Sequence, residues 1–155
     1  MLDYPERIER YHARGFLTES DAASLRTLLS QCDRGWDFNH GDLLPSNLLM
    51  TPDGRCAPLD WEFGGLFLPG FDLAFLHTTL ASTPYAQGRI NEIVASDDIR
   101  VPFAVNQAMV LTRELRIHTE LPAGTWRDER LRTIESQWQQ ARRLLKQTVR
   151  KAETP

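Results

Sequence analysis

The sequence reads HGDLLPSN over residues 40–47 and LDWE over residues 59–62. Gly41 and Pro45 predict a tight loop that has Asp42 and Asn47 at its two ends. A strong turn signal, TPDG at residues 51–54, lies between the two stretches, so residues 47–50 and 55–59 are expected to pair as a small β-hairpin. This hairpin should bring Asp60 back beside Asn47.

Three polar side chains at this predicted centre suit the chemistry of phosphoryl transfer. An amide oxygen from Asn47 beside the carboxylate of Asp60 forms the hard-oxygen site that Mg²⁺ binds while it keeps waters and substrate phosphates. Asp42 is then a separate carboxylate, able to act as a base or to orient a hydroxyl nucleophile. Phosphoryl transfer requires these parts because it depends on positioning and charge neutralisation. The alternative is an Asx-rich loop whose side chains only cap its own turns.

The rest of the sequence has mainly helical periodicity. Pro5 and Gly15 bracket a first helix, and Thr18 with Asp21 has the spacing of a capping box at the start of a second. A short strand is expected at residues 36–39. Later helices are expected from three apolar faces: Leu73, Leu76 and Leu80; Ala104, Ala108, Leu111 and Leu115; and Leu131, Ile134, Trp138, Ala141 and Leu145. We predict an α+β, mostly helical single domain over residues 1–155.

Composition and charge argue against several other classes of protein. The chain of 155 residues is 41% hydrophobic and 25% charged, which indicates a globular domain and not a disordered segment. It has no apolar run of about eighteen residues and no secretory signal, so neither a membrane span nor export is expected. Cys32 and Cys56 are interpreted as reduced core thiols of a cytoplasmic protein. The basic residues near the C-terminus are interpreted as a solvated helix face, so no nucleic-acid partner is expected.

The central motifs resemble those of a known family of kinases. A His-x-Asp pair followed by Asn, with a further Asp downstream, is similar to the kinase catalytic loop and its metal-binding signature. The version here has Gly at the second position, and it is followed in order by LDWEFGG at residues 59–65 and PGFDLA at residues 69–74. Together these blocks resemble the aminoglycoside phosphotransferase family, whose relatives include choline, homoserine and fructosamine kinases.

This resemblance implies a protein-kinase-like C-terminal lobe that carries out ATP-dependent, Mg²⁺-assisted phosphoryl transfer to a hydroxyl group of a small molecule. It implies that Asp42 is the catalytic base and that Asn47 and Asp60 bind Mg²⁺. It further implies that Asp72 braces the catalytic loop by accepting backbone N–H bonds. His40 is expected to pack against the metal-binding segment as a buried, hydrogen-bonded histidine.

The family also has an N-terminal lobe, which supplies a glycine-rich loop over the phosphates and a lysine that reaches them. This sequence has no G-x-G-x-x-G pattern, and its only lysines are Lys146 and Lys151. We therefore expect a catalytic lobe without its nucleotide-binding lobe. Two functions stay open: a phosphotransferase lobe that depends on a partner and is weakly active or inactive alone, and a non-catalytic, pseudokinase-like binding module.

Two surfaces are candidates for contacts with other molecules. Apolar side chains are expected to be exposed where an N-terminal lobe or a second copy of the chain would dock: Phe63, Leu66, Phe67 and Leu68. The family's acceptor pocket is built by the C-terminal helices, where acidic side chains either attract a cationic acceptor or form solvated surface: Glu114, Glu120, Asp128 and Glu129. Glu62 is similarly ambiguous, as an acid near the metal or a solvated glutamate. Trp61 is expected to pack in the core.

Overall fold

The computed structural model describes residues 2–32 and 35–152. Its helices are α1 (Tyr4–Ala13), α2 (Glu19–Leu29), α3 (Phe71–Thr79), α4 (Pro84–Ser96), α5 (Arg100–Glu120) and α6 (Thr125–Ala152). Its strands are β1 (Asp37–Asn39), β2 (Leu48–Met50), β3 (Cys56–Pro58) and β4 (Gly65–Phe67), and short 3-10 turns occupy η1 (Pro45–Asn47) and η2 (Trp61–Phe63). The predicted α+β, mostly helical fold is confirmed. None of the described helices is long and apolar enough to cross a membrane.

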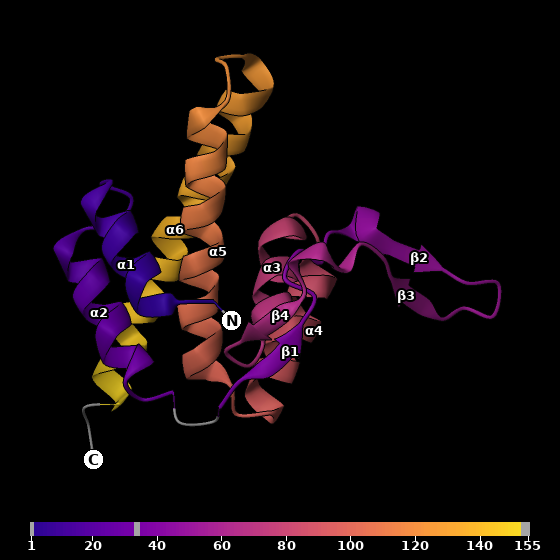
Figure 1. Ribbon diagram of the computed structural model, residues 1–155, viewed down its shortest axis with the longest axis horizontal. Helices are drawn as coiled ribbons and strands as arrows, with labels where there is room; N and C mark the ends of the chain where they lie inside the picture. The colour runs from indigo at the N-terminus through magenta and orange to yellow at the C-terminus, as the bar shows by residue number, and fades with distance from the viewer. Residues whose placement is uncertain (1, 33–34, 153–155) are drawn as a thin grey trace.

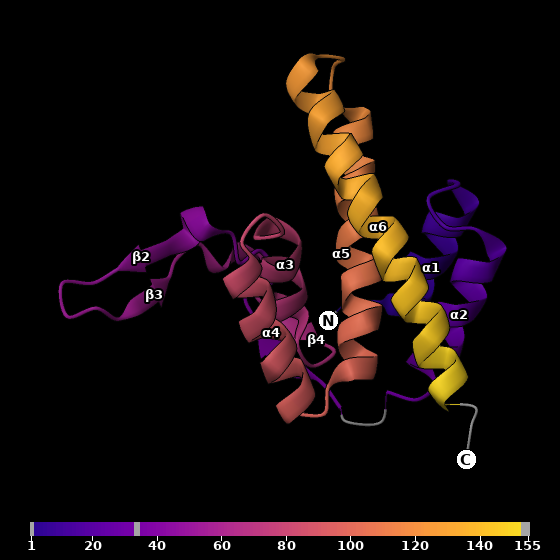
Figure 2. The same ribbon diagram turned by 180° about the vertical axis from the view of Figure 1, so that it is seen from behind.

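Helix α5 runs through the middle of the molecule. On one side it packs against α6 and against the pair formed by α1 and α2, and on the other side it packs against α3 and α4 (Figure 1). Helices α5 and α6 extend together beyond the rest of the body, and the β2–β3 hairpin projects from the side of α3 and α4 (Figure 2). The polar loop between β1 and β2 therefore lies on the α3 side of α5.

Helix α2 begins with the predicted capping box. The Thr18 hydroxyl accepts the backbone N–H of Asp21 at 3.2 Å, and the Asp21 carboxylate accepts the N–H of Thr18 at 3.0 Å. The same carboxylate accepts a hydrogen bond of 2.8 Å from Arg142 of α6. Asp21 thus caps the N-terminus of α2 and also joins this helix to α6, which is distant in the sequence.

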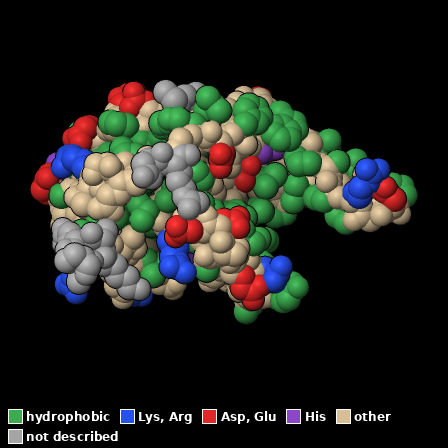
Figure 3. Space-filling view, turned by 90° about the horizontal axis from the view of Figure 1, so that it is seen from below, with side chains coloured by type: hydrophobic (Ala, Val, Ile, Leu, Met, Phe, Trp, Pro, Cys, Tyr) green, Lys and Arg blue, Asp and Glu red, His purple; other side chains and the backbone are tan. Residues whose placement is uncertain are grey.

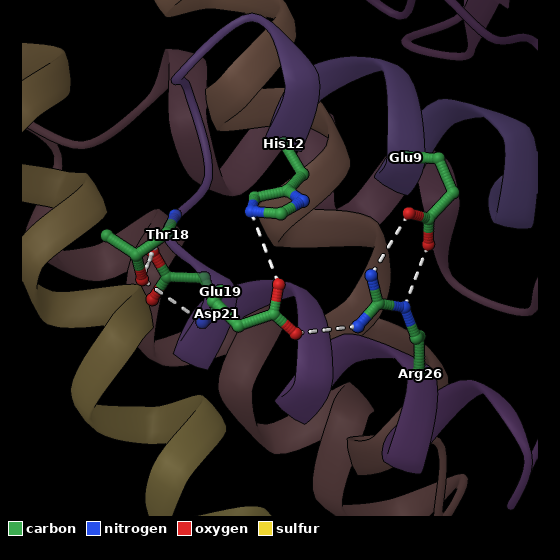
Figure 4. A network of polar contacts seen from close by, with 6 residues as sticks. All are labelled: Glu9, His12, Thr18, Glu19, Asp21 and Arg26. Carbon is green, nitrogen blue, oxygen red and sulfur yellow. Dashed lines mark hydrogen bonds and ion pairs between the residues drawn. The ribbon is translucent and has the colours of Figure 1, made fainter.

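Ion pairs on the surface connect α1 to α2 (Figure 4). Arg26 donates hydrogen bonds to Glu9 at 2.8 Å and to Glu19 at 3.2 Å, and the Glu19 carboxylate lies 3.3 Å from Nε2 of His12. The hydrogen bond from Arg26 lowers the pKa of Glu9. These side chains are between about a third and two thirds exposed, so solvent weakens the contribution of the pairs to stability.

Two apolar clusters meet at α5. The first lies between α1, α2, α5 and α6 and contains the predicted apolar faces of the last two helices, with Leu131 partly buried. The second lies between β4, α3, α4 and α5. The predicted face of α3 packs only at the edge of this cluster, through Leu73 and Leu76, and is half-buried. The fully buried residues of α3 are Phe71, Ala74, Phe75 and Thr78. Asp72 explains the difference, because its carboxylate bonds the loop after β1 and so fixes the rotation of the helix.

The strands form two separate antiparallel pairs. The predicted hairpin is confirmed, with Leu48 opposite Pro58 and Met50 opposite Cys56. The short strand β1 also forms, and it pairs with β4. The sequence did not indicate β4, because this strand has only three residues and begins with a glycine. Cys56 is exposed on β3 and Cys32 is half-buried, so the expectation of two core thiols is wrong.

A buried asparagine joins α5 to α1 and to the segment just before α3. Asn106 is fully buried, accepts the Tyr4 hydroxyl at 2.5 Å and donates to the carbonyl oxygens of Leu68 and Pro69 at 3.0 Å each. The Tyr4 hydroxyl accepts the N–H of Leu68 at 3.1 Å. Burial raises the pKa of Tyr4 above its usual value, which keeps the phenol a neutral donor. These bonds fix the turn from which α3 starts.

We expect Asn106→Leu to lower the free energy of unfolding by about 2–4 kcal/mol, because it leaves the Tyr4 hydroxyl and two buried carbonyls without their partner. Urea denaturation followed by circular dichroism measures this change. Asn91→Leu, on the exposed surface of α4, is the matched control and should change stability by less than about 0.5 kcal/mol. Equal stability of the two variants would show that the network contributes nothing.

Candidate active site

One carboxylate from α3 holds the loop that carries Asp42. The Oδ2 and Oδ1 atoms of Asp72 accept the backbone N–H groups of His40 and Gly41 at 2.7 and 2.9 Å. In return, the side chain of Asn39 accepts the N–H of Asp72 at 3.2 Å. The expectation that Asp72 braces this loop is confirmed. Hydrogen bonds to an ionised acceptor are strong, so the position of the loop follows that of α3.

Gly41 is required by the local backbone. Its φ is +81°, in the left-handed region, and a Cβ atom there would lie 2.3 Å from the carbonyl oxygen of Phe63. Any other residue would therefore be strained and would also push the two segments apart. The glycine of the motif allows the loop to touch the chain that follows Asp60.

His40 connects the loop to the end of the hairpin. The side chain is 1% exposed, and its Nε2 lies 2.7 Å from the carbonyl oxygen of Leu59. Because a carbonyl can only accept, Nε2 carries the proton. The N–H of Leu59 donates to the carbonyl of Asn47 at 2.8 Å. Both backbone groups of the residue before Asp60 are thus held, and His40 has the packing role that the sequence predicted.

The side chain of Asn47 is oriented by the loop itself. Its Nδ2 donates to the backbone carbonyl of Asp42 at 3.0 Å, which directs the amide oxygen away from that carbonyl. In the described part of the chain, Oδ1 has one contact, a long one of 3.5 Å from the Ser46 hydroxyl. This oxygen is therefore available as a ligand, and its assignment to a metal is a prediction.

Asp60 has an unusual backbone conformation. Its φ of 64° and ψ of 67° are left-handed, a conformation that is uncommon for a non-glycine residue, costs about 1–3 kcal/mol and is enriched at functional sites. The side chain is exposed. Within residues 2–32 and 35–152, no group of three or more His, Cys, Asp or Glu side chains is placed to hold a metal ion.

Arg113 of α5 is a site residue that the sequence motifs did not reveal. Its guanidinium donates to Oδ1 of Asp42 at 2.9 Å, and the two side chains are only 20% and 16% exposed. Its Cζ lies 5.8 Å from the ring centroid of Phe63 and 5.5 Å from that of Phe75. The only signal in the sequence is its spacing of seven residues from Asn106, which puts two polar side chains on an otherwise apolar helix face.

Apolar side chains are exposed around the site, at the base of the β2–β3 hairpin (Figure 3). The prediction for this surface is correct for Phe63 and Leu66, which are 51% and 43% exposed, and wrong for Phe67 and Leu68, which are buried in the two apolar clusters. Trp61 is also 49% exposed and stacks on Phe38 with ring centroids 6.0 Å apart, so the expectation that it is a core residue is wrong.

The chain matches one protein family and two solved structures. The phosphotransferase enzyme family matches residues 2–93, more than half of the chain. The crystal structure of choline kinase LicA from Streptococcus pneumoniae is similar at a TM-score of 0.61 and 17% sequence identity, over 94% of this chain and 56% of that one. LicA in complex with AMP is similar at a TM-score of 0.55 and 18% identity, over 90% of this chain and 55% of that one.

The chain thus spans a little over half the length of the solved structures that it matches. At these identities the likeness establishes a shared, protein-kinase-like fold. A comparison with curated proteins gives no significant match. The family match over residues 2–93, together with the fold shared with a choline kinase, establishes that this chain belongs to the phosphotransferase enzyme family, the kinase-like group of aminoglycoside phosphotransferases and choline kinases.

Proposed function

We propose that this chain is the catalytic lobe of an enzyme that transfers the terminal phosphoryl group of ATP to a hydroxyl group of a small molecule, with Mg²⁺ as cofactor. The hydrogen bonds of His40 carry the proposal, because they join the loop with Asp42 and Asn47 to the backbone just before Asp60. A loop that only capped its own turns would have no need of these contacts with α3 and the hairpin.

Asp42 is the proposed base. Its side chain is part-buried but reachable, Arg113 binds Oδ1, and within the described residues no hydrogen bond reaches Oδ2. In the proposed reaction, Oδ2 accepts the proton of the acceptor hydroxyl while the hydroxyl oxygen bonds to the terminal phosphorus of ATP. The bond between that phosphorus and the bridging oxygen breaks, and ADP leaves.

Asn47 and Asp60 are the proposed Mg²⁺ ligands. Their oxygens are hard donors, one oriented by the hydrogen bond to Asp42 and the other presented by a left-handed backbone. The donor set fits Mg²⁺, which would supply neutralisation of phosphate charge when bound. Through Mg²⁺, the two residues would hold the phosphates on the side of the loop that carries Asp42.

The nucleotide-binding elements are proposed to come from outside residues 1–155, on another segment or another chain. LicA, which shares the fold, has been solved with AMP. This sequence has no G-x-G-x-x-G loop, and its only lysines lie near the end of α6. The exposed apolar surface around Trp61, Phe63 and Leu66 suits contact with such a lobe. We place the protein in the cytoplasm, where ATP is available.

Mg²⁺ should bind weakly to the chain alone and not measurably to Asp60→Ala, which leaves a single amide ligand. NMR titration of the backbone amide signals of residues 42–60 with Mg²⁺ measures both affinities. Asp53→Ala removes an exposed carboxylate from the hairpin tip and should bind Mg²⁺ as the parent does. The site is misassigned if Asp60→Ala and the parent have the same affinity.

The chain alone should show little ATP-dependent phosphotransfer, because positioning of the phosphates contributes up to about 7–11 kcal/mol in well-oriented reactions. A nucleotide-binding lobe of a related kinase, added as a separate polypeptide, should restore turnover of ATP over a panel of hydroxyl acceptors. Asp42→Asn should lower the restored rate by about 10²–10⁴-fold without changing the circular dichroism spectrum. Asp53→Asn should leave the rate unchanged.

Strong turnover by the isolated chain would refute the need for a second lobe. If no combination of lobe and acceptor gives turnover, the proposal of an enzyme fails and the chain is better described as a non-catalytic, pseudokinase-like binding module.

A further inference from the structure

Arg113 puts a permanent positive charge beside the proposed base. The guanidinium uses one N–H group on Oδ1 of Asp42, and within the described part of the chain no hydrogen bond is made by its remaining N–H groups. The rings of Phe63 and Phe75 lie within 6 Å of it and limit its movement. Spare donors in a fixed position, next to a carboxylate oxygen that is open to a hydroxyl, form a ready-made site for an anion.

Three of the four acidic side chains that could attract a cationic acceptor have basic partners instead. Glu120 accepts hydrogen bonds from Arg14 at 2.7 Å and from Arg116 at 2.8 Å. Glu114 lies 4.0 Å from Arg130, and Asp128 lies 3.0 Å from Arg127. Of the four acids predicted for such a role, only Glu129 has no ion pair within the described residues, and it is exposed. The charged side chain in direct contact with the proposed base is that of Arg113, 2.9 Å from Oδ1 of Asp42.

From this arrangement we propose that the acceptor is an acidic hydroxy compound, such as a hydroxy acid or a sugar acid, and that Arg113 binds its acidic group. The inference rests on the proposed phosphotransfer at Asp42. The acceptor hydroxyl donates a hydrogen bond to Oδ2 of Asp42. A carboxylate one or two bonds from the carbon that carries this hydroxyl accepts the spare N–H groups of Arg113. A cationic amino alcohol in the same position would meet the guanidinium as a like charge and could accept none of its spare N–H groups through an ammonium group.

The first test compares ligands on the unaltered chain, without Mg²⁺ or nucleotide. Glycerate, glycerol and choline offer hydroxyl groups with an acidic, a neutral and a cationic neighbour, respectively. NMR titration that follows the amide signals of Gly41 and Asp42 and the Nε–H of Arg113 gives the three affinities. Glycerate should bind at least about tenfold more tightly than glycerol or choline. Equal or tighter binding of choline, or no binding of glycerate, overturns the proposal.

The second test asks whether Arg113 provides the preference. Arg113→Met should abolish the advantage of glycerate over glycerol, and Arg113→Lys should keep part of it because the charge remains without the planar fork. Arg116→Met, on the same helix but paired with Glu120, should bind glycerate as the parent does. Circular dichroism and thermal unfolding show whether each variant folds. An unchanged preference in folded Arg113→Met overturns the proposal, and the ligand comparison on the parent chain decides if that variant does not fold.

Inorganic phosphate separates this inference from a related one. If phosphate binds through Arg113 and glycerate does not, Arg113 contacts the transferred phosphoryl group and the proposal for the acceptor is wrong. Failure of the proposed function looks different: glycerate would bind through Arg113, yet the chain with an added nucleotide-binding lobe would transfer no phosphate. Phosphotransfer to choline but not to glycerate would leave the function standing and refute the inference.

Discussion

The carboxylate of Asp72 is the contact on which the site depends. It accepts the N–H groups of His40 and Gly41, and through them it sets where the next segments lie. His40 then holds the end of the hairpin at Leu59, and the loop orients Asn47 through the carbonyl of Asp42. Without this acceptor, two buried or half-buried N–H groups would lose their partners at a cost of about 1–3 kcal/mol each. The same hydrogen bonds constrain the rotation of α3. The packing of the second apolar cluster and the geometry of the loop therefore depend on each other.

Helix α5 supplies the second constraint. Asn106 and Arg113 lie two turns apart on one face, about 10 Å along the axis. The first fixes the turn before α3 through Leu68 and Pro69, and the second reaches Asp42. A single rigid helix therefore sets the distance between the start of α3 and the proposed base. A shift of α5 along its axis would disturb both contacts together, which ties the stability of the core to the position of Asp42.

What the sequence predicts well is what depends on neighbours along the chain. The capping box of Thr18, the hairpin around residues 51–54 and the bracing role of Asp72 follow from local spacing or from motif resemblance. The rotation of α3, the pairing of β1 with β4 and the exposure of Trp61 depend on contacts between distant segments. Leu73, Leu76 and Leu80 form a good apolar stripe, yet they are only half-buried, because the hydrogen bonds of Asp72 also constrain the rotation of α3. Periodicity alone does not show whether apolar burial or the hydrogen bonds of Asp72 determine the rotation of the helix.

Arg113 illustrates the same limit at the site. It lies 71 residues after Asp42 in a helix that otherwise reads as core, so no spacing rule connects the two. The motif residues are the proposed reacting groups, and the resemblance implies that kinases acting on different acceptors share them. The proposed acceptor contact comes from a C-terminal helix, where a charged side chain is compatible with surface, core edge or site. Reaction type can therefore be inferred from residues 40–72 alone, whereas acceptor chemistry depends on which charge the fold brings to Asp42. The side chain that contacts Asp42 is the guanidinium of Arg113, which lies within 6 Å of two aromatic ring centroids.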